Sequence, residues 1–206
     1  EQTEEIRADA DKTRMKIPPI FGIDAIHGHS LLNGAVIFPS QLAAACSWNP
    51  RLVEKMGEVT AREVNADGID WVFSPVLCLG RDTRWGRVDE TFGEDPFLTG
   101  KLGAAIVKGY EKDGLVAACL KHYIGYGASE AGRDYVYTEI SAQTLWDTYL
   151  LPYEMGVKAG AATLMSSFND ISGVPGSANH YTMTEILKER WGHDGFIVSY
   201  WGAIEQ

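Results

Sequence analysis

The sequence has few basic residues and no long apolar run. Its 206 residues carry 18 Lys and Arg against 28 Asp and Glu, a formal net charge of −10 at pH 7. Nucleic acids and anionic membranes both require a basic face on the protein, so we expect neither as a partner. No apolar stretch approaches the roughly 20 residues of a transmembrane helix, and we expect no membrane span.

Cysteine is also scarce. The three residues, Cys46, Cys78 and Cys119, lie far apart, each among small or apolar neighbours. An odd number at such wide spacing predicts buried free thiols rather than a disulfide framework. With 45% hydrophobic and 22% charged residues, the chain has the composition of one globular core.

Apolar runs and helical patterns alternate along the chain. Strands are expected at 17–23, 71–77, 115–123, 161–168 and 195–200. Helices are expected at 1–14, 40–47, 51–66, 96–113, 142–160 and 182–192. Asn49-Pro50 and Asp95-Pro96 are typical helix starts, a capping side chain followed by proline, and Pro152 should kink or split its helix. The strands are near-continuous apolar runs, which indicates a parallel sheet covered on both faces.

The composition of the loops distinguishes between two possible α/β architectures. Long loops rich in charge and glycine follow the strands and shorter ones follow the helices, as in a (β/α) barrel, whose site is built from the loops after the strands. A doubly wound sheet would carry a glycine-rich phosphate loop after its first strand, and "GIDAIHGH" is not one. We therefore predict one partial, TIM-like (β/α) barrel over residues 1–206 and no cofactor. Because eight units need about 250 residues, five units predict a barrel that is incomplete in this chain.

Polar and aromatic side chains follow each expected strand. Charged groups that hydrogen-bond hydroxyls, beside a flat aromatic ring, suit a sugar ligand. Asp95 is expected to be a helix cap only, and Arg81, Asp82 and Arg84 to brace their loop as ion pairs. The strand-end residues are Asp24, His27 and His29; the loop 80–96; Lys121 and His122; Met165, Ser166, Ser167, Phe168 and Asn169; and Ser199, Tyr200 and Trp201.

Five motifs in order resemble one enzyme family. "FGIDAIHGH", "RDTRWGRVDETFGEDP", "CLKHYIGYG", "MSSFNDISGVP" and "GFIVSYWGA" resemble the N-terminal barrel of glycoside hydrolase family 3, β-glucosidase type, from about Ile17 to Ala203. The resemblance implies a retaining exo-enzyme that removes β-linked glucose from the non-reducing end of a β-glucoside or oligosaccharide, in a secreted or periplasmic protein. It implies that the sugar is held by Asp24, Arg87, Lys121 and His122 in a pocket also lined by Arg133, Met165 and Trp201.

Tyr200 departs from the family pattern. The family's nucleophile is the aspartate of an "SDW" or "SDH" triplet, and here the triplet reads "SYW". Retaining hydrolysis uses two carboxyl groups about 5–5.5 Å apart, and a phenol with a pKa of about 10 needs a base before it can attack. The family's acid/base glutamate comes from sequence downstream of the barrel, in an α/β domain absent from this chain. The chain as given is therefore expected to be inactive, with the missing C-terminal part as a partner of the barrel.

Two other functions remain open. A non-catalytic sugar-binding paralogue would keep the pocket and lose the nucleophile, as Tyr200 suggests. A metal-dependent amidohydrolase could use the His27-x-His29 pair and a carbamylated Lys121, but the fourth and fifth strands offer no further ligands. We therefore expect no metal.

Overall fold

A parallel sheet forms the centre of the computed structural model, which describes residues 2–205. Its five strands are β1 (Gly22–Ile23), β2 (Trp71–Val72), β3 (Ala117–Tyr123), β4 (Thr163–Ser166) and β7 (Phe196–Val198). They lie side by side in chain order, each parallel to its neighbours. A doubly wound sheet reverses its strand order midway, whereas a (β/α) barrel advances in one direction. The predicted barrel-type fold is confirmed.

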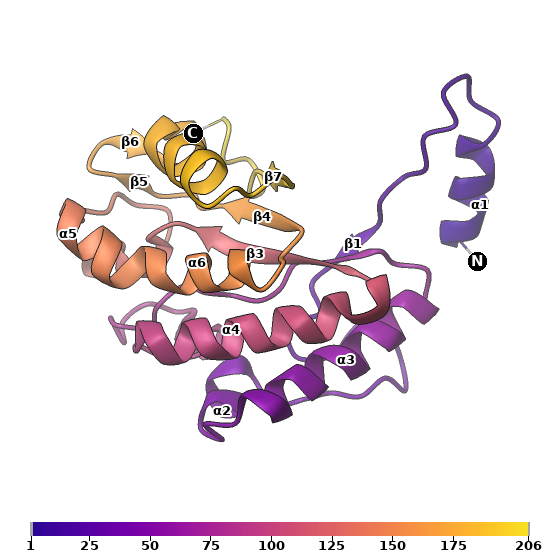
Figure 1. Ribbon diagram of the computed structural model, residues 1–206, viewed down its shortest axis with the longest axis horizontal. Coiled ribbons are helices and arrows are strands. Elements are labelled where there is room, and N and C mark those ends of the chain that lie inside the picture. The colour runs from indigo at the N-terminus through magenta and orange to yellow at the C-terminus, as the bar shows by residue number, and fades with distance from the viewer. Residues whose placement is uncertain (1, 206) are drawn as a thin grey trace.

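Helices cover one side of this sheet. Figure 1 shows α3, α4 and α6 lying along the strands, while α1 stands apart beyond an extended segment. The helix η7 continues the layer, because the ring of its neighbour Trp191 packs on Tyr123 of β3. The α- and π-helical elements are α1 (Gln2–Ala10), α2 (Gln41–Ala45), α3 (Pro50–Ala66), α4 (Pro96–Glu111), α5 (Ala142–Thr144), the π-helix η5 (Leu145–Tyr149), α6 (Leu150–Lys158) and the π-helix η7 (Tyr181–Arg190). Short 3₁₀ turns are η1 (Val88–Glu90), η2 (Lys112–Gly114), η3 (Tyr126–Ala128), η4 (Glu130–Gly132) and η6 (Gly176–Ala178).

The predicted helix starts are confirmed. Asn49 accepts a hydrogen bond from the Leu52 amide at 3.2 Å, and Asp95 accepts one from the Leu98 amide at 2.6 Å. Each cap satisfies a backbone N–H that the first helical turn leaves without a partner. Pro152 splits the predicted helix 142–160 as expected: the π-turn η5 lies directly before α6, because proline lacks an N–H and its ring displaces the carbonyl four residues earlier.

All five strands are shorter than predicted, and prolines explain the two that are shortened most, β1 and β2. Only Gly22–Ile23 of the expected strand 17–23 pairs, since Pro18 and Pro19 cannot donate to a ladder. In the second strand the regular ladder ends at Val72 before Pro75, although the Ser74 and Pro75 carbonyls still accept from the Cys119 and Lys121 amides at 3.0 Å. A single bridge between Val76 and Lys121 follows.

A hairpin follows β4. The strands β5 (Asp170–Ile171) and β6 (Val174–Pro175) pair antiparallel across Ser172-Gly173. Both turn residues have positive φ, 50° and 85°, as a two-residue hairpin turn requires. The expectation of three buried thiols is wrong for Cys46, which is exposed because it caps the C-terminus of α2 on the outer surface, whereas Cys78 and Cys119 are buried and free.

Glu58 of α3 pairs with two lysines, Lys55 of the same helix and Lys112 directly after α4. Its carboxylate lies 2.8 Å from the ammonium of Lys55 and 2.7 Å from that of Lys112, and its side chain is 10% exposed. The hydrogen bond from Lys112, then that from Lys55, holds the pKa of Glu58 at about 2, below its ordinary 4.5. Because the folded pKa lies below the unfolded one, this pairing stabilises the fold above about pH 4.5 and is lost as the pH falls toward 2.

We expect Glu58→Gln to be less stable than the parent at pH 7, with the difference shrinking as the pH falls from about 4.5 to about 2. Urea unfolding at a series of pH values measures it. Glu154→Gln is the matched control, because Glu154 pairs with the exposed Lys158 at the surface of α6 and such pairs contribute little. A stability difference for Glu58→Gln that stays constant across this pH range would contradict the linkage.

Candidate functional site

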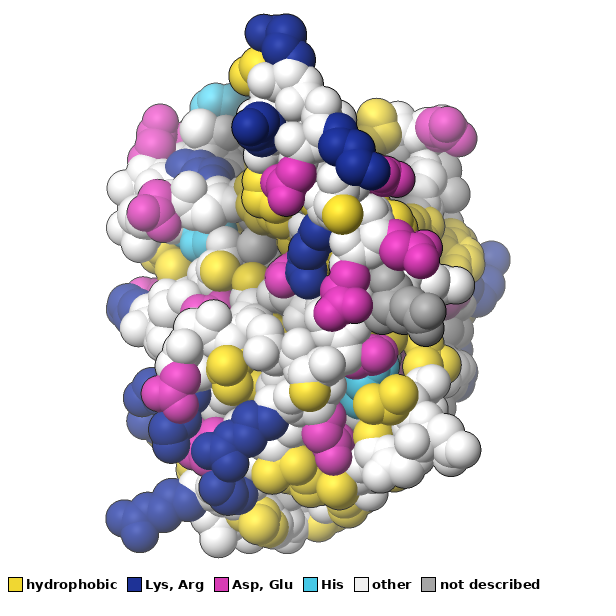
Figure 2. All heavy atoms as spheres, turned by 90° about the vertical axis from the view of Figure 1, so that its right-hand side faces the viewer, with side chains coloured by type: hydrophobic (Ala, Val, Ile, Leu, Met, Phe, Trp, Pro, Cys, Tyr) yellow, Lys and Arg dark blue, Asp and Glu magenta, His cyan; other side chains and the backbone are white. Residues whose placement is uncertain are grey.

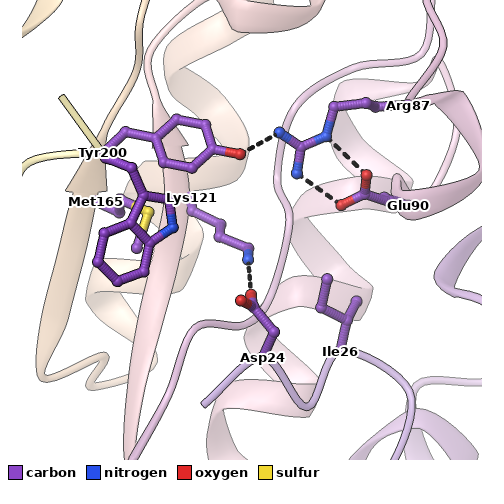
Figure 3. Close-up of a pocket in the computed structure, with 8 residues that line it drawn as sticks. Asp24, Ile26, Arg87, Glu90, Lys121, Met165 and Tyr200 are labelled. Atoms are coloured by element: carbon purple, nitrogen blue, oxygen red, sulfur yellow. Dashed lines mark hydrogen bonds and ion pairs between the residues drawn. The ribbon is translucent and has the colours of Figure 1, made fainter. Parts of the chain in front are cut away.

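One cavity of about 160 Å³ opens where the C-terminal ends of the strands meet. Asp24 directly follows β1, Lys121 lies in β3, Met165 in β4, and Tyr200 two residues beyond β7. Parallel strands place their carboxyl ends at one edge of a sheet, which is why residues so far apart in sequence converge. The complete lining is Asp24, Ile26, Arg87, Glu90, Lys121, Met165, Tyr200 and Trp201 (Figure 3).

Lys121 and Asp24 form the first polar pair of the cavity. The Lys121 ammonium donates to Asp24 Oδ1 at 2.5 Å. The lysine side chain is 4% exposed, whereas that of Asp24 is 53% exposed. An ammonium has three N–H donors, and within residues 2–205 Asp24 is the one partner that Lys121 hydrogen-bonds through its side chain. The pair thus offers a ligand both unused donors and an accessible carboxylate.

Arg87 is held as a planar fork beside this pair. Its Nε and Nη2 atoms donate to the two carboxylate oxygens of Glu90 at 2.7 and 2.8 Å, and Nη1 donates to the Tyr200 hydroxyl at 2.6 Å (Figure 3). Burial lowers the pKa of the guanidinium, but the hydrogen bond and charge of Glu90 outweigh burial and raise it. Arg87 therefore carries a fixed charge and directs it at the hydroxyl of Tyr200.

Tyr200 is packed by aromatic neighbours. Its ring stacks on the His122 imidazole, with centroids 4.4 Å apart and planes inclined by 25°, and it lies 4.2 Å from the ring of Phe168. Burial raises the pKa of the phenol above its ordinary value of 10, and Arg87 opposes that rise only in part. At neutral pH the side chain is consequently a protonated phenol and a weak nucleophile.

His122 lies behind Tyr200 and not in the cavity wall. It is completely buried, with Nδ1 3.7 Å from Cys78 Sγ. Its Nε2 atom has no hydrogen-bond partner among residues 2–205. Burial, followed by the charges of Lys121 and Arg87, lowers the pKa of this imidazole well below its ordinary value. His122 is therefore neutral, next to the pocket but covered by the tyrosine ring.

Of the other residues predicted from sequence, Arg133 lies outside the cavity. It is exposed and donates from Nε to the Glu130 carbonyl at 3.4 Å. The expected loop brace is present as the Asp82–Arg84 pair at 2.7 Å. Glu90 braces Arg87 and also lines the cavity; its position three residues after Arg87 is the sequence signal for that pairing.

The metal-binding alternative gains no support from the described part of the chain. His29 Nε2 lies 3.1 Å from Asp67 Oδ2, at the C-terminal end of α3. Within residues 2–205 no three His, Cys, Asp or Glu side chains gather as a set of ligands.

The surface was expected to lack a basic face and a membrane span. On the face seen in Figure 2, acidic and basic side chains are intermixed and form no broad basic area. No helix in the region 2–205 is both long and apolar enough to cross a bilayer.

Comparison with known proteins gives consistent matches. The family model of the glycosyl hydrolase family 3 N-terminal domain matches residues 1–206. The periplasmic β-glucosidase of Salmonella typhimurium is 35% identical, over 94% of this chain and 25% of its own length. A β-xylosidase of Formosa agariphila is 36% identical, over 97% of this chain and 30% of its own. A solved β-glucosidase from intestinal bacteria, involved in saponin metabolism, is 43% identical with a TM-score of 0.93, over 98% of this chain and 28% of that protein. The chain thus spans less than a third of each relative.

Proposed function

Because the chain belongs to glycosyl hydrolase family 3, as its motifs predict, we propose that its pocket binds the non-reducing-end β-glucosyl unit of a glucoside or oligosaccharide. The observation that carries this proposal is the convergence of Asp24, Arg87 and Lys121 in one cavity at the strand ends. The enzyme type proposed is a retaining exo-β-glucosidase, to which these residues contribute the sugar-binding part.

The lining suits a pyranose chemically. A sugar hydroxyl both donates and accepts a hydrogen bond; Lys121 supplies donors and the half-exposed Asp24 supplies an acceptor. Trp201, 70% exposed at the cavity, offers a flat apolar ring for the C–H face of a sugar. Since a β-xylosidase is among the relatives, glucose and xylose are the two sugars to compare.

Hydrolysis needs two further groups that the described site lacks. The nucleophile position holds Tyr200, and both carboxylates of the cavity are already paired, Asp24 with Lys121 and Glu90 with Arg87. We propose that the acid/base glutamate, the remaining barrel strands and an α/β domain belong to sequence that follows residue 206. Tyr200 also favours a second candidate function, a non-catalytic sugar-binding protein that keeps the pocket without the nucleophile.

Lys121→Ala is expected to weaken glucose binding by about tenfold or more, because a charge-assisted hydrogen bond in such a site contributes about 1.5–3 kcal/mol. Isothermal titration of the full chain with glucose, and separately with xylose, gives the two dissociation constants. Lys158→Ala is the control, since Lys158 pairs with Glu154 at the exposed surface of α6. Equal affinity of the parent and Lys121→Ala for both sugars would show that the sugar site lies elsewhere.

A further inference from the structure

Tyr200 contacts two of the four residues, Arg87 and His122, that the family resemblance predicts to hold the sugar. Its hydroxyl accepts the Nη1–H of Arg87 at 2.6 Å, and its ring covers the His122 imidazole at 4.4 Å. The cavity beside it is lined by Lys121 and Asp24 but not by His122. The phenol oxygen therefore takes the Nη1–H of Arg87 that a sugar hydroxyl in this cavity could accept, and the phenol ring covers the face of the imidazole.

The imidazole of His122 carries the second, independent observation. Its Nε2 is fully buried and has no hydrogen-bond partner within residues 2–205. Buried polar atoms are nearly always paired, and one left unpaired is unfavourable. The stacked face of Tyr200 offers no hydrogen-bonding atom to it, since the only polar atom of that side chain is bonded to Arg87. A hydrogen bond to Nε2 lies in the plane of the imidazole, so a ligand hydroxyl would reach it at the ring edge, next to the face that Tyr200 covers.

We propose that Tyr200 is an internal competitor of the sugar: it occupies the place of the pyranose ring, and a sugar binds fully only after the phenol has swung out. The inference rests on the proposed function, because it takes the ligand to be a sugar held by Arg87, Lys121 and His122. On binding, Arg87 exchanges the phenol oxygen for a sugar hydroxyl, and the face of the His122 imidazole that Tyr200 covers becomes accessible.

The backbone allows this movement. Tyr200 lies two residues beyond the end of β7, so no sheet hydrogen bond holds it. It begins a turn closed by the Ala203 amide on the Tyr200 carbonyl at 2.9 Å. A side chain in such a turn can change rotamer without breaking the sheet, and its contacts with Arg87, His122 and Phe168 set the closed position.

The expected change in glucose affinity depends on the fraction of molecules in which Tyr200 has left the sugar site. When the binding-competent conformation is a minor one, the apparent affinity falls by its fractional population. The charge-assisted hydrogen bond to Arg87 together with the stacking on His122 favours the position of Tyr200 seen in the structure by a factor of about ten or more. Tyr200→Ala is therefore expected to bind glucose about tenfold more tightly than the parent or better. Tyr200→Phe, which keeps the ring and loses the bond to Arg87, is expected to lie between them.

Isothermal titration of the parent, Tyr200→Phe and Tyr200→Ala with glucose and xylose tests the order of affinities. Tyr137→Ala is the matched control, because Tyr137 is 49% exposed and does not line this cavity; its affinity should equal that of the parent. If Tyr200→Ala binds no more tightly than the parent, the competitor role is wrong while the sugar site stands. If no variant binds either sugar, the proposed function itself fails, and this inference with it.

A measurement on the unmodified chain keeps the test independent of any folding defect in Tyr200→Ala. Tetranitromethane nitrates accessible tyrosines, and mass analysis of the peptide containing Tyr200 reports its modification. Saturating glucose is expected to increase nitration of Tyr200, because the phenol leaves its packed position. Protection of Tyr200 by glucose would make it an ordinary wall of the sugar site and would overturn the proposal.

Discussion

With Tyr200→Asp, the protein is expected to hydrolyse an aryl β-glucoside at least about a thousandfold faster than the same protein with Tyr200. Both compared proteins consist of this chain with the sequence that supplies the acid/base glutamate attached. In the parent, the residue at the nucleophile position is a phenol whose pKa is raised by burial and whose oxygen accepts from Arg87. Aspartate supplies the missing carboxylate. Its shorter side chain also frees Arg87 and His122 for the sugar.

The decisive measurement is kcat for p-nitrophenyl β-glucoside in the parent, Tyr200→Asp and Tyr200→Asn. Asparagine has the shape of aspartate but cannot attack the anomeric carbon. Tyr200→Asn therefore shows the effect of removing the phenol without adding a nucleophile, and its kcat should remain near background. A 2-fluoro glucoside should leave a covalent adduct on the peptide containing residue 200 in Tyr200→Asp alone. If the parent is already as fast as Tyr200→Asp, the nucleophile lies elsewhere. Residues 1–206 alone should gain little, because nucleophile and acid act as a unit.

The helix starts could be predicted because their causes are local. A capping side chain and a following proline act within four residues, so Asn49-Pro50 and Asp95-Pro96 determine where α3 and α4 begin. The strand ends were harder to predict. Whether Pro18 or Pro75 interrupts a ladder depends on which neighbour each N–H would have faced, and hydrophobicity along the chain does not contain that information.

Those parts of the site that follow from the order and direction of the strands could be predicted from the sequence. Asp24, Lys121 and Met165 converge because parallel strands end at one edge, a property that holds once the strands are recognised. Side-chain packing between distant segments is a different matter. Arg87 and Tyr200 are 113 residues apart, and neither the bond between them nor the burial of His122 behind the ring has a sequence signature. The position of Arg133 outside the cavity likewise depends on the path of a long loop.

Arg87→Lys is expected to weaken glucose binding by about tenfold or more, almost as much as Arg87→Ala, although the positive charge is kept. The comparison belongs in the Tyr200→Ala background, where no phenol competes for the guanidinium. In that background the loss of affinity arises from the direction of the guanidinium. Arg87 uses Nε and Nη2 for the two oxygens of Glu90, and this fixes the direction of Nη1 into the cavity.

A lysine cannot reproduce this arrangement, because its ammonium is a single point of charge on a flexible stem. If it pairs with Glu90 it leaves the sugar, and if it reaches the sugar it leaves the Glu90 carboxylate part-buried and unpaired. Arg84→Lys is the control from the same loop: Arg84 is 67% exposed and pairs with Asp82 at 2.7 Å, so its replacement should change the dissociation constant by less than about twofold. Titration with glucose decides between charge and geometry. An Arg87→Lys protein that binds as well as its parent would mean that charge alone holds the sugar at this position, and that the fork with Glu90 serves only to brace the loop.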